Sequence, residues 1–240
     1  MRPAWCAQVG IRHQNEGQLP NPLLPMPLRD HTVPVTPFRQ NCSIVWCDVT
    51  QEAAIVDPGG EIPRLLAEVE RLGLTLKAIW LTHAHIDHAG GTGELARLRE
   101  LPIIGPHQGD QFWIDGLPQQ AAMFGFPPAE MFTPTRWLED GDTVQIGHET
   151  LSVRHCPGHT PGHVVFHSAS AKRCFVGDVL FAGSIGRTDF PGGDHATLIR
   201  AINERLWPMG DETVFVPGHG PESSFGEERR TNPFVGGRWG

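Results

Sequence analysis

The fold of this chain is decided by the stretch Thr82-His83-Ala84-His85-Ile86-Asp87-His88. It follows the apolar run 78–81, and together they predict a buried strand over residues 77–82. Side chains two residues apart in extended backbone share a face. His83 and His85 are therefore expected to leave the end of the strand together, where they could chelate one cation.

Two more potential ligands follow within the same stretch. Asp87 and His88 lie where the chain must turn toward Gly90-Gly91, so they are expected to point to a second position close by. Imidazole suits zinc, iron and nickel, and a carboxylate adds a hard oxygen ligand. A short histidine-rich tract can also be an adventitious surface feature. The stretch predicts half of a two-metal site.

Three further segments repeat this layout, in which an apolar run ends at a potential ligand flanked by glycine. They are residues 151–159, 174–178 and 213–219, which end at His159, Asp178 and His219. Glycine beside a ligand allows a sharp turn and a close approach of the backbone to the site. Four segments of one design in one chain are far more specific than any one of them.

These segments resemble the metallo-β-lactamase superfamily from about residue 32 onward. The resemblance implies a four-layer αββα sandwich of the α/β class, with two mixed β-sheets flanked by helices. It implies that one metal is bound by His83, His85 and His159 and the other by Asp87, His88 and His219, with Asp178 as the bridge. The implied cofactor is a pair of divalent ions, with zinc expected and iron or manganese as alternatives.

The resemblance extends to one branch of the superfamily. The commonest class of lactamases proper has a cysteine where this chain has Asp178. The segments 158–163, 177–181, 186–190 and 217–220 are most similar to short bacterial hydroxyacylglutathione hydrolases of the glyoxalase II type. That similarity implies cleavage of a small-molecule thioester, S-D-lactoylglutathione to D-lactate and glutathione, by attack of a metal-bridging hydroxide.

Alternative functions remain at this point. An iron-dependent glutathione persulfide dioxygenase shares a loop similar to Gly186–Phe190, and a hydrolase of another thioester or of a lactone fits the same ligands. A non-catalytic metal-binding module is disfavoured because no ligand is missing. Full-length glyoxalase II enzymes hold glutathione with a helical domain and tyrosines, whereas this chain ends soon after His219 and contains no tyrosine.

Four residues are candidates for roles beyond metal binding itself. Asp178 is expected to fix the separation of the metals, and Asp87 either aims the attacking hydroxide or is purely a ligand. Arg187 either binds a substrate carboxylate or forms a salt bridge to Asp189 or Asp194. His163 is expected to orient a ligand rather than to be one.

The remaining histidines are expected to lie on the surface or to take part in packing, and the tryptophans are expected in the core rather than on a substrate-binding surface. Cys156 is expected to be a small buried residue. The histidines are His13, His31, His107, His148, His155, His167 and His195, and the tryptophans are Trp46, Trp80, Trp113, Trp137 and Trp207.

Composition bounds the other properties. The chain has 240 residues and a net charge of −8, so it lacks the positive field that holds nucleic acid. No apolar run approaches the roughly 20 residues needed to span a membrane. Five cysteines without a CxxC pair predict a reducing compartment, with the cytoplasm as the expected location. The oligomeric state stays open.

The chain is expected to form a Pro-rich, poorly ordered extension over 1–30 and a single domain over 31–240. Met26 is a hypothetical physiological start. Strands are expected at 32–36, 43–47 and 53–56, and helices at 62–72 and near 94–98 and 196–206. Further strands are expected between 143 and 176.

Overall fold

The structure is a computed structural model in which residues 28–237 are described. Most of the expected 1–30 extension, with Met26 and His13, lies outside the described residues. Residues 28–30 already belong to the first strand, β1 (Leu28–Val35). The strand begins this early because Leu28 is buried and pairs with Cys47 on the neighbouring strand.

The first half of the chain builds a five-stranded mixed sheet in the order β1-β2-β3-β4-β5. β1, β2 and β3 pair antiparallel, whereas β3, β4 and β5 are parallel. The remaining strands of this sheet are β2 (Gln40–Cys47), β3 (Glu52–Val56), β4 (Thr75–Trp80) and β5 (Ile103–Ile104). The strand expected at 77–82 is therefore shifted two residues toward the N-terminus.

The second half builds a six-stranded mixed sheet in the order β13-β12-β9-β8-β7-β6, and β10 and β11 form a separate two-stranded sheet. β12 and β9 are parallel, and every other pair in the six-stranded sheet is antiparallel. The bounds are β6 (Thr143–Ile146), β7 (Glu149–His155), β8 (Val164–Ser168), β9 (Arg173–Gly177), β10 (Leu180–Phe181), β11 (Ser184–Ile185), β12 (Val214–Pro217) and β13 (Ser223–Ser224).

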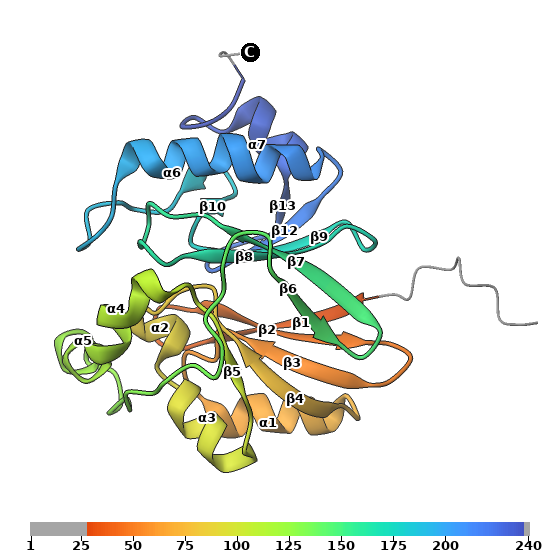
Figure 1. Cartoon of the computed structure of the whole chain (residues 1–240), viewed down its shortest axis with the longest axis vertical. Coiled ribbons are helices and arrows are strands. Elements are labelled where there is room, and N and C mark those ends of the chain that lie inside the picture. Colours follow the sequence, from red (N-terminus) through yellow and green to blue (C-terminus); the bar gives the residue numbers. More distant parts are fainter. Residues whose placement is uncertain (1–27, 238–240) are drawn as a thin grey trace, which may run out of the picture.

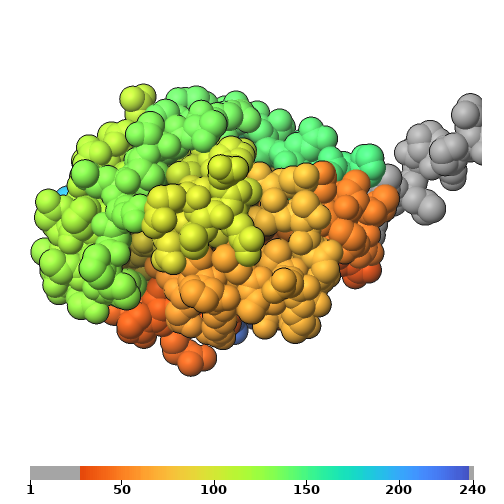
Figure 2. All heavy atoms as spheres, turned by 90° about the horizontal axis from the view of Figure 1, so that it is seen from below, coloured from red at the N-terminus to blue at the C-terminus, as the bar shows by residue number. Residues whose placement is uncertain are grey.

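Helices cover the outer face of each sheet, so the expected four layers are present (Figure 1). The helices are α1 (Ile62–Arg71), α2 (Ile86–Ala89), α3 (Thr92–Arg99), α4 (Gln111–Asp115), α5 (Leu117–Phe124), α6 (His195–Ala201) and α7 (Phe225–Thr231). The chain continues from α6 through a π-helical turn at Ile202–Leu206. Seen from below in Figure 2, the outer face is formed mostly by the first half of the chain.

Three apolar clusters hold these layers together. One packs α1 against the first sheet through residues such as Leu65 and Ile55. A second fills the space between the sheets, where the rings of Trp80 and Phe166 lie 5.5 Å apart. The third packs the second sheet against α6 and α7, and it includes Leu198 of α6. The core position expected for Trp80 is confirmed, since it is fully buried.

Within the described residues, no helix has both the length and the apolar character needed to cross a membrane.

Candidate metal centre

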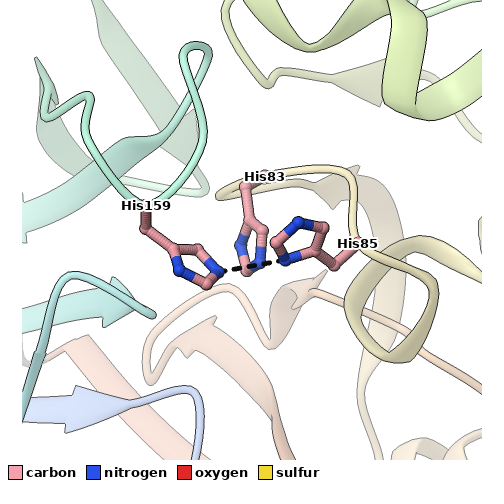
Figure 3. A group of neighbouring side chains, drawn as sticks. All are labelled: His83, His85 and His159. Carbon is pink, nitrogen blue, oxygen red and sulfur yellow. Dashed lines mark hydrogen bonds between the residues drawn. The ribbon is translucent and has the colours of Figure 1, made fainter. Parts of the chain in front are cut away.

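A first group of three imidazoles forms where loops from the two sheets meet, and we call it the first trio. His83 and His85 lie on the loop after β4, whereas His159 lies on the loop between β7 and β8. One nitrogen of each ring lies within 4.8 Å of the others, and His159 Nε2 is 3.0 Å from His85 Nδ1. The three rings converge in Figure 3, and all three residues are buried.

A second trio lies beside the first. Asp87 and His88 are carried by the short helix α2, and His219 follows β12. His219 Nε2 lies 3.1 Å from Asp87 Oδ2, and His88 Nε2 lies 3.8 Å from the same oxygen. The first sheet therefore supplies two members of this trio and the second sheet supplies one.

Asp178 lies between the two trios. It follows β9, the parallel neighbour of β12, so it reaches the same edge of the sheet as His219. Its Oδ2 is 3.6 Å from His159 Nε2 in the first trio, and its Oδ1 is 3.3 Å from His88 Nε2 in the second. A single carboxylate is thus placed to contact two cations at once.

Glycine permits the close approach that the sequence predicted. A Cβ atom at Gly218 would lie 2.0 Å from Asp178 Oδ1, so no side chain fits at this position. Gly177 has φ +49°, in the left-handed region, and a Cβ there would lie 2.5 Å from Thr82 Oγ1. The strand ends can approach the trios because these two residues lack side chains.

Hydrogen bonds at Nδ1 fix how four of the rings are presented. The Nδ1 contacts are from His159 to the Arg187 carbonyl (2.8 Å), from His219 to the Phe38 carbonyl (3.1 Å), from His88 to Asp57 Oδ2 (2.9 Å) and from His83 to Thr82 Oγ1 (3.1 Å). A ring that donates from Nδ1 keeps the Nε2 lone pair free for a metal. Within residues 28–237, the buried Nε2 atoms of His83 and His88 have no hydrogen-bond partner.

The electrostatics of the site favour cations. Burial, and then the neighbouring imidazoles, lower the pKa of His83 well below its usual value, and burial also lowers the pKa of His85. Both rings are therefore neutral near pH 7 and present lone pairs. Burial raises the pKa of Asp178, but His88, followed by His159 and His219, outweighs it and holds that pKa well below its usual range. The ionised carboxylate of Asp178 thus lies beside the neutral rings of His83 and His85. The pKa of His88 is raised well above its usual value, because Asp178 and Asp87 outweigh the effect of burial, so a cation at the second trio would displace a proton from His88.

The donor set fits a pair of borderline divalent ions. The seven groups gathered here are the imidazoles His83, His85, His88, His159 and His219 and the carboxylates Asp87 and Asp178. Imidazole and carboxylate together suit zinc, iron and manganese. A further grouping of Asp57, His83 and His88 is occupied by hydrogen bonds, because Asp57 already accepts from Thr82 and from His88.

The sequence reasoning missed Asp57, which supports both trios. It is buried and accepts hydrogen bonds from Thr82 N (2.7 Å), Thr82 Oγ1 (2.6 Å) and His88 Nδ1. Asp57 follows the apolar strand β3 and precedes Pro58-Gly59-Gly60, a layout similar to the one that marks Asp178. The same signal would have found it.

Asp110 was missed as well, and no sequence signal marks it. It is fully buried and accepts hydrogen bonds from Ala84 N (3.0 Å), Thr160 Oγ1 (2.9 Å) and Gly162 N (2.6 Å). The carboxylate therefore ties the loop of His83 and His85 to the loop of His159. Its partners come from two segments that are distant in sequence, the loop of Ala84 and the loop of Thr160 and Gly162, which only the fold brings together.

His163 takes the orienting position expected of it. Its ring stacks on His83 with centroids 4.6 Å apart, and its Nε2 accepts a hydrogen bond from Asp178 N (3.1 Å). Among the described histidines, none of the others joins a trio; they are His31, His107, His148, His155, His167 and His195. Cys156 is buried, as expected.

Trp113 differs from the expectation for it, whereas Arg187 forms the salt bridge to Asp189 that was one of its two alternatives. Trp113 packs partly on the first core cluster, but it also lines the pocket beside the trios, with its ring 4.6 Å from that of His85. The expectation of a purely core role for Trp113 is therefore wrong, because its short helix turns the indole toward the site. Arg187 also lines the pocket, and its guanidinium binds Asp189 at 2.6 and 2.5 Å.

Comparison with known proteins places this geometry in context. Residues 35–219 match the sequence model of the metallo-beta-lactamase superfamily. Hydroxyacylglutathione hydrolase GloC of Haemophilus influenzae is 45% identical over 204 residues, which cover 85% of this chain and 96% of that protein. The human mitochondrial persulfide dioxygenase ETHE1 is 32% identical over 77% of this chain and 66% of its own length.

A solved structure shows the same fold. The crystal structure of TTHA1623 in a di-iron-bound form matches with a TM-score of 0.78 and 38% sequence identity. The match covers 85% of this chain and all of that one.

Proposed function

The chain belongs to the metallo-β-lactamase superfamily, and from this premise we propose that it is a metal-dependent hydrolase that cleaves S-D-lactoylglutathione to D-lactate and glutathione. One observation carries the proposal: two ligand trios, drawn from both sheets, lie on either side of the Asp178 carboxylate. The 45% identity to a hydroxyacylglutathione hydrolase supports the substrate class.

We assign the first cation to His83, His85 and His159 and the second to Asp87, His88 and His219, with Asp178 in contact with both. Zinc is the proposed metal, and the same donors also accept iron or manganese. A bound pair of such ions supplies an activated water at neutral pH and polarises the carbonyl under attack. Hydrolysis adds water across the C–S bond, so the acyl carbon gains oxygen and the sulfur leaves as a thiol.

The chain's own residues prepare this chemistry. Asp178 is ionised and fixed by the His163 contact at its backbone N–H, so it sets the separation of the trios. Asp87 lines the pocket and offers a carboxylate oxygen to the second trio. We propose that it both binds the ion and accepts a hydrogen bond from the attacking water.

Replacement of the central carboxylate tests the proposal. We expect Asp178→Asn to lower kcat for S-D-lactoylglutathione by about 10³-fold or more, because a preorganised charge at the reacting centre is lost. Thiol release, followed with a chromogenic thiol reagent, measures the rate. Asp48→Asn removes an exposed carboxylate that, among residues 28–237, forms an ion pair with Arg29 alone, and the variant should retain wild-type turnover. Unchanged turnover in Asp178→Asn would refute the proposed site.

The number of metal ions per chain distinguishes the proposed hydrolase from a persulfide dioxygenase. The second trio is complete in this chain, which favours two ions over one. Elemental analysis is expected to find two metals per chain, with no oxygen uptake on glutathione persulfide. One iron per chain together with oxygen uptake would establish the dioxygenase instead.

A further inference from the structure

The two trios open into one large pocket. The pocket encloses about 890 Å³ and is bordered on its floor by His85, His159, Asp87, Asp178 and His219. Any substrate bound to the trios must therefore place its neighbouring groups against the other lining residues.

Those walls are aromatic on both sides of the trios. The aromatic residues in the lining are Phe38, Phe112, Trp113, Phe124, Phe181 and Phe190. Phe190 lies 4.9 Å from the His85 ring, next to the first trio. Phe38 borders the second trio, because its carbonyl accepts from His219 Nδ1 and its ring lies 5.9 Å from that of Phe124.

The lining offers little to a charged substrate. Apart from the floor residues, Arg187 is the one ionisable side chain among the lining residues, all of which lie within the described chain. Asp189 holds its guanidinium through two hydrogen bonds, and the same group lies 4.2 Å from the centroid of the Phe190 ring. Its charge is thus compensated, and its stem extends the apolar wall.

Several wall residues are exposed to solvent although they are apolar. Phe38 is 46% exposed, Phe112 44% and Met123 76%. Apolar surface gathered around a site is typical of a binding wall, and its burial by a ligand is favourable. A substrate with an apolar substituent would bury these side chains, whereas one with a small polar substituent would leave them exposed to solvent.

We propose that the preferred substrates are thioesters with an apolar, above all aromatic, group beside the scissile bond. This inference rests on the proposed function and deepens it. The group can belong to the acyl part or to the thiol part, since aromatic walls flank both trios. An aromatic ring can stack edge-to-face with Phe38 or Phe190, an arrangement that a methyl group cannot make.

Three thioesters test the proposal and tell the two parts apart. S-D-lactoylglutathione and S-D-mandeloylglutathione differ only in that a methyl group in the first is a phenyl group in the second, on the carbon next to the carbonyl. The S-D-lactoyl thioester of phenylmethanethiol keeps the lactoyl group and has an aromatic thiol in place of glutathione. For each thioester, kcat/KM of the zinc-loaded enzyme is divided by the rate constant for its hydrolysis by free hydroxide. This ratio corrects for differences in intrinsic reactivity among the three thioesters.

We expect at least one aromatic thioester to exceed S-D-lactoylglutathione by about 10-fold or more in this corrected ratio. The aromatic thioester with the higher ratio shows whether the acyl part or the thiol part of the substrate contacts the aromatic wall. Equal or lower values for both aromatic thioesters would overturn the inference while the proposed function stands. Failure of the metal-loaded enzyme to cleave any of the three would overturn both.

Substitution of the wall tests its role directly. Phe38→Ala and Phe190→Ala should each cut the preference for the aromatic thioester by about 5–10-fold, and Phe38→Leu should keep part of it. Phe234→Ala is the matched control, because Phe234 is 53% exposed and lies outside the pocket lining. Circular dichroism confirms folding of each variant. An unchanged preference in folded Phe38→Ala and Phe190→Ala would contradict the proposal.

Discussion

At the scale of single residues, the site depends on which nitrogen of each imidazole carries the proton. Asp57 settles this for His88 by accepting from its Nδ1, and for His83 through the hydroxyl of Thr82, which donates to Asp57 while it accepts from the ring. A buried carboxylate that never contacts the substrate thus directs two Nε2 lone pairs into the site.

Asp57→Asn tests this orienting role. The amide presents an NH₂ group where one carboxylate oxygen stood, so either Thr82 N loses its acceptor or Thr82 Oγ1 and His88 Nδ1 both lose theirs. We expect metal affinity to fall by about 10–100-fold, the usual effect of losing an outer-shell partner. Competition with a chromogenic chelator measures the affinity.

The control for this substitution is Asp211→Asn, which removes an exposed carboxylate paired with Arg229 at 3.4 Å. It should leave metal affinity unchanged. If Asp57→Asn matched the wild type in the same titration, Asp57 would have no orienting role.

At the scale of elements, the loop after β4 and the loop between β7 and β8 are held together by Asp110. Burial raises the pKa of this carboxyl to about 7 from an ordinary value of 3.8, although Gly162, Thr160 and Ala84 lower it by hydrogen bonding. The folded protein therefore keeps this proton to a higher pH than the unfolded chain does. Its contribution to stability must fall as pH rises between those two values.

Asp110→Asn isolates that contribution in the metal-free protein. The variant is expected to be less stable by about 1–3 kcal/mol at neutral pH, since its amide cannot accept all three hydrogen bonds. The difference in unfolding free energy between wild type and variant should narrow from about pH 4 to pH 7, by at most about 1.4 kcal/mol per pH unit. Urea unfolding across this range measures it, and a difference that widens with pH would be the opposite result.

The elements themselves were largely predictable from the sequence, because each has a strong period. The helix expected at 62–72 is observed at Ile62–Arg71, and the strand expected at 53–56 at Glu52–Val56. The short helices α4 and α5 were not predicted. Gly116 and Pro118 interrupt that segment, so no helical period builds up, and for the same reason the position of Trp113 on the pocket wall was not visible.

At the scale of the whole molecule, the sequence located ligand segments but not the supports between them. His159, Asp178 and His219 each end an apolar run, so a local pattern marks them. No local sequence pattern identifies Asp110 or the aromatic wall, because their roles arise only when the two sheets pack together. The Val164 N–H donates to the Thr82 carbonyl at 2.8 Å, one of the few backbone links by which the sheets meet at the site.

Because the ligands come from both sheets, bound metal should act as a clamp on the whole fold. An ion that binds only the folded chain adds about 2.7 kcal/mol of stability at a free concentration 100 times its Kd. For a chain of this size that corresponds to about 5–10 °C in Tm per ion. Calorimetry should show that a chelator lowers the Tm of the metal-loaded wild type by this amount. The decrease in Tm should be smaller for Asp178→Asn, because this variant binds the metals more weakly. An identical Tm for loaded and chelated wild-type protein would mean that the seven residues do not join the two sheets through metal.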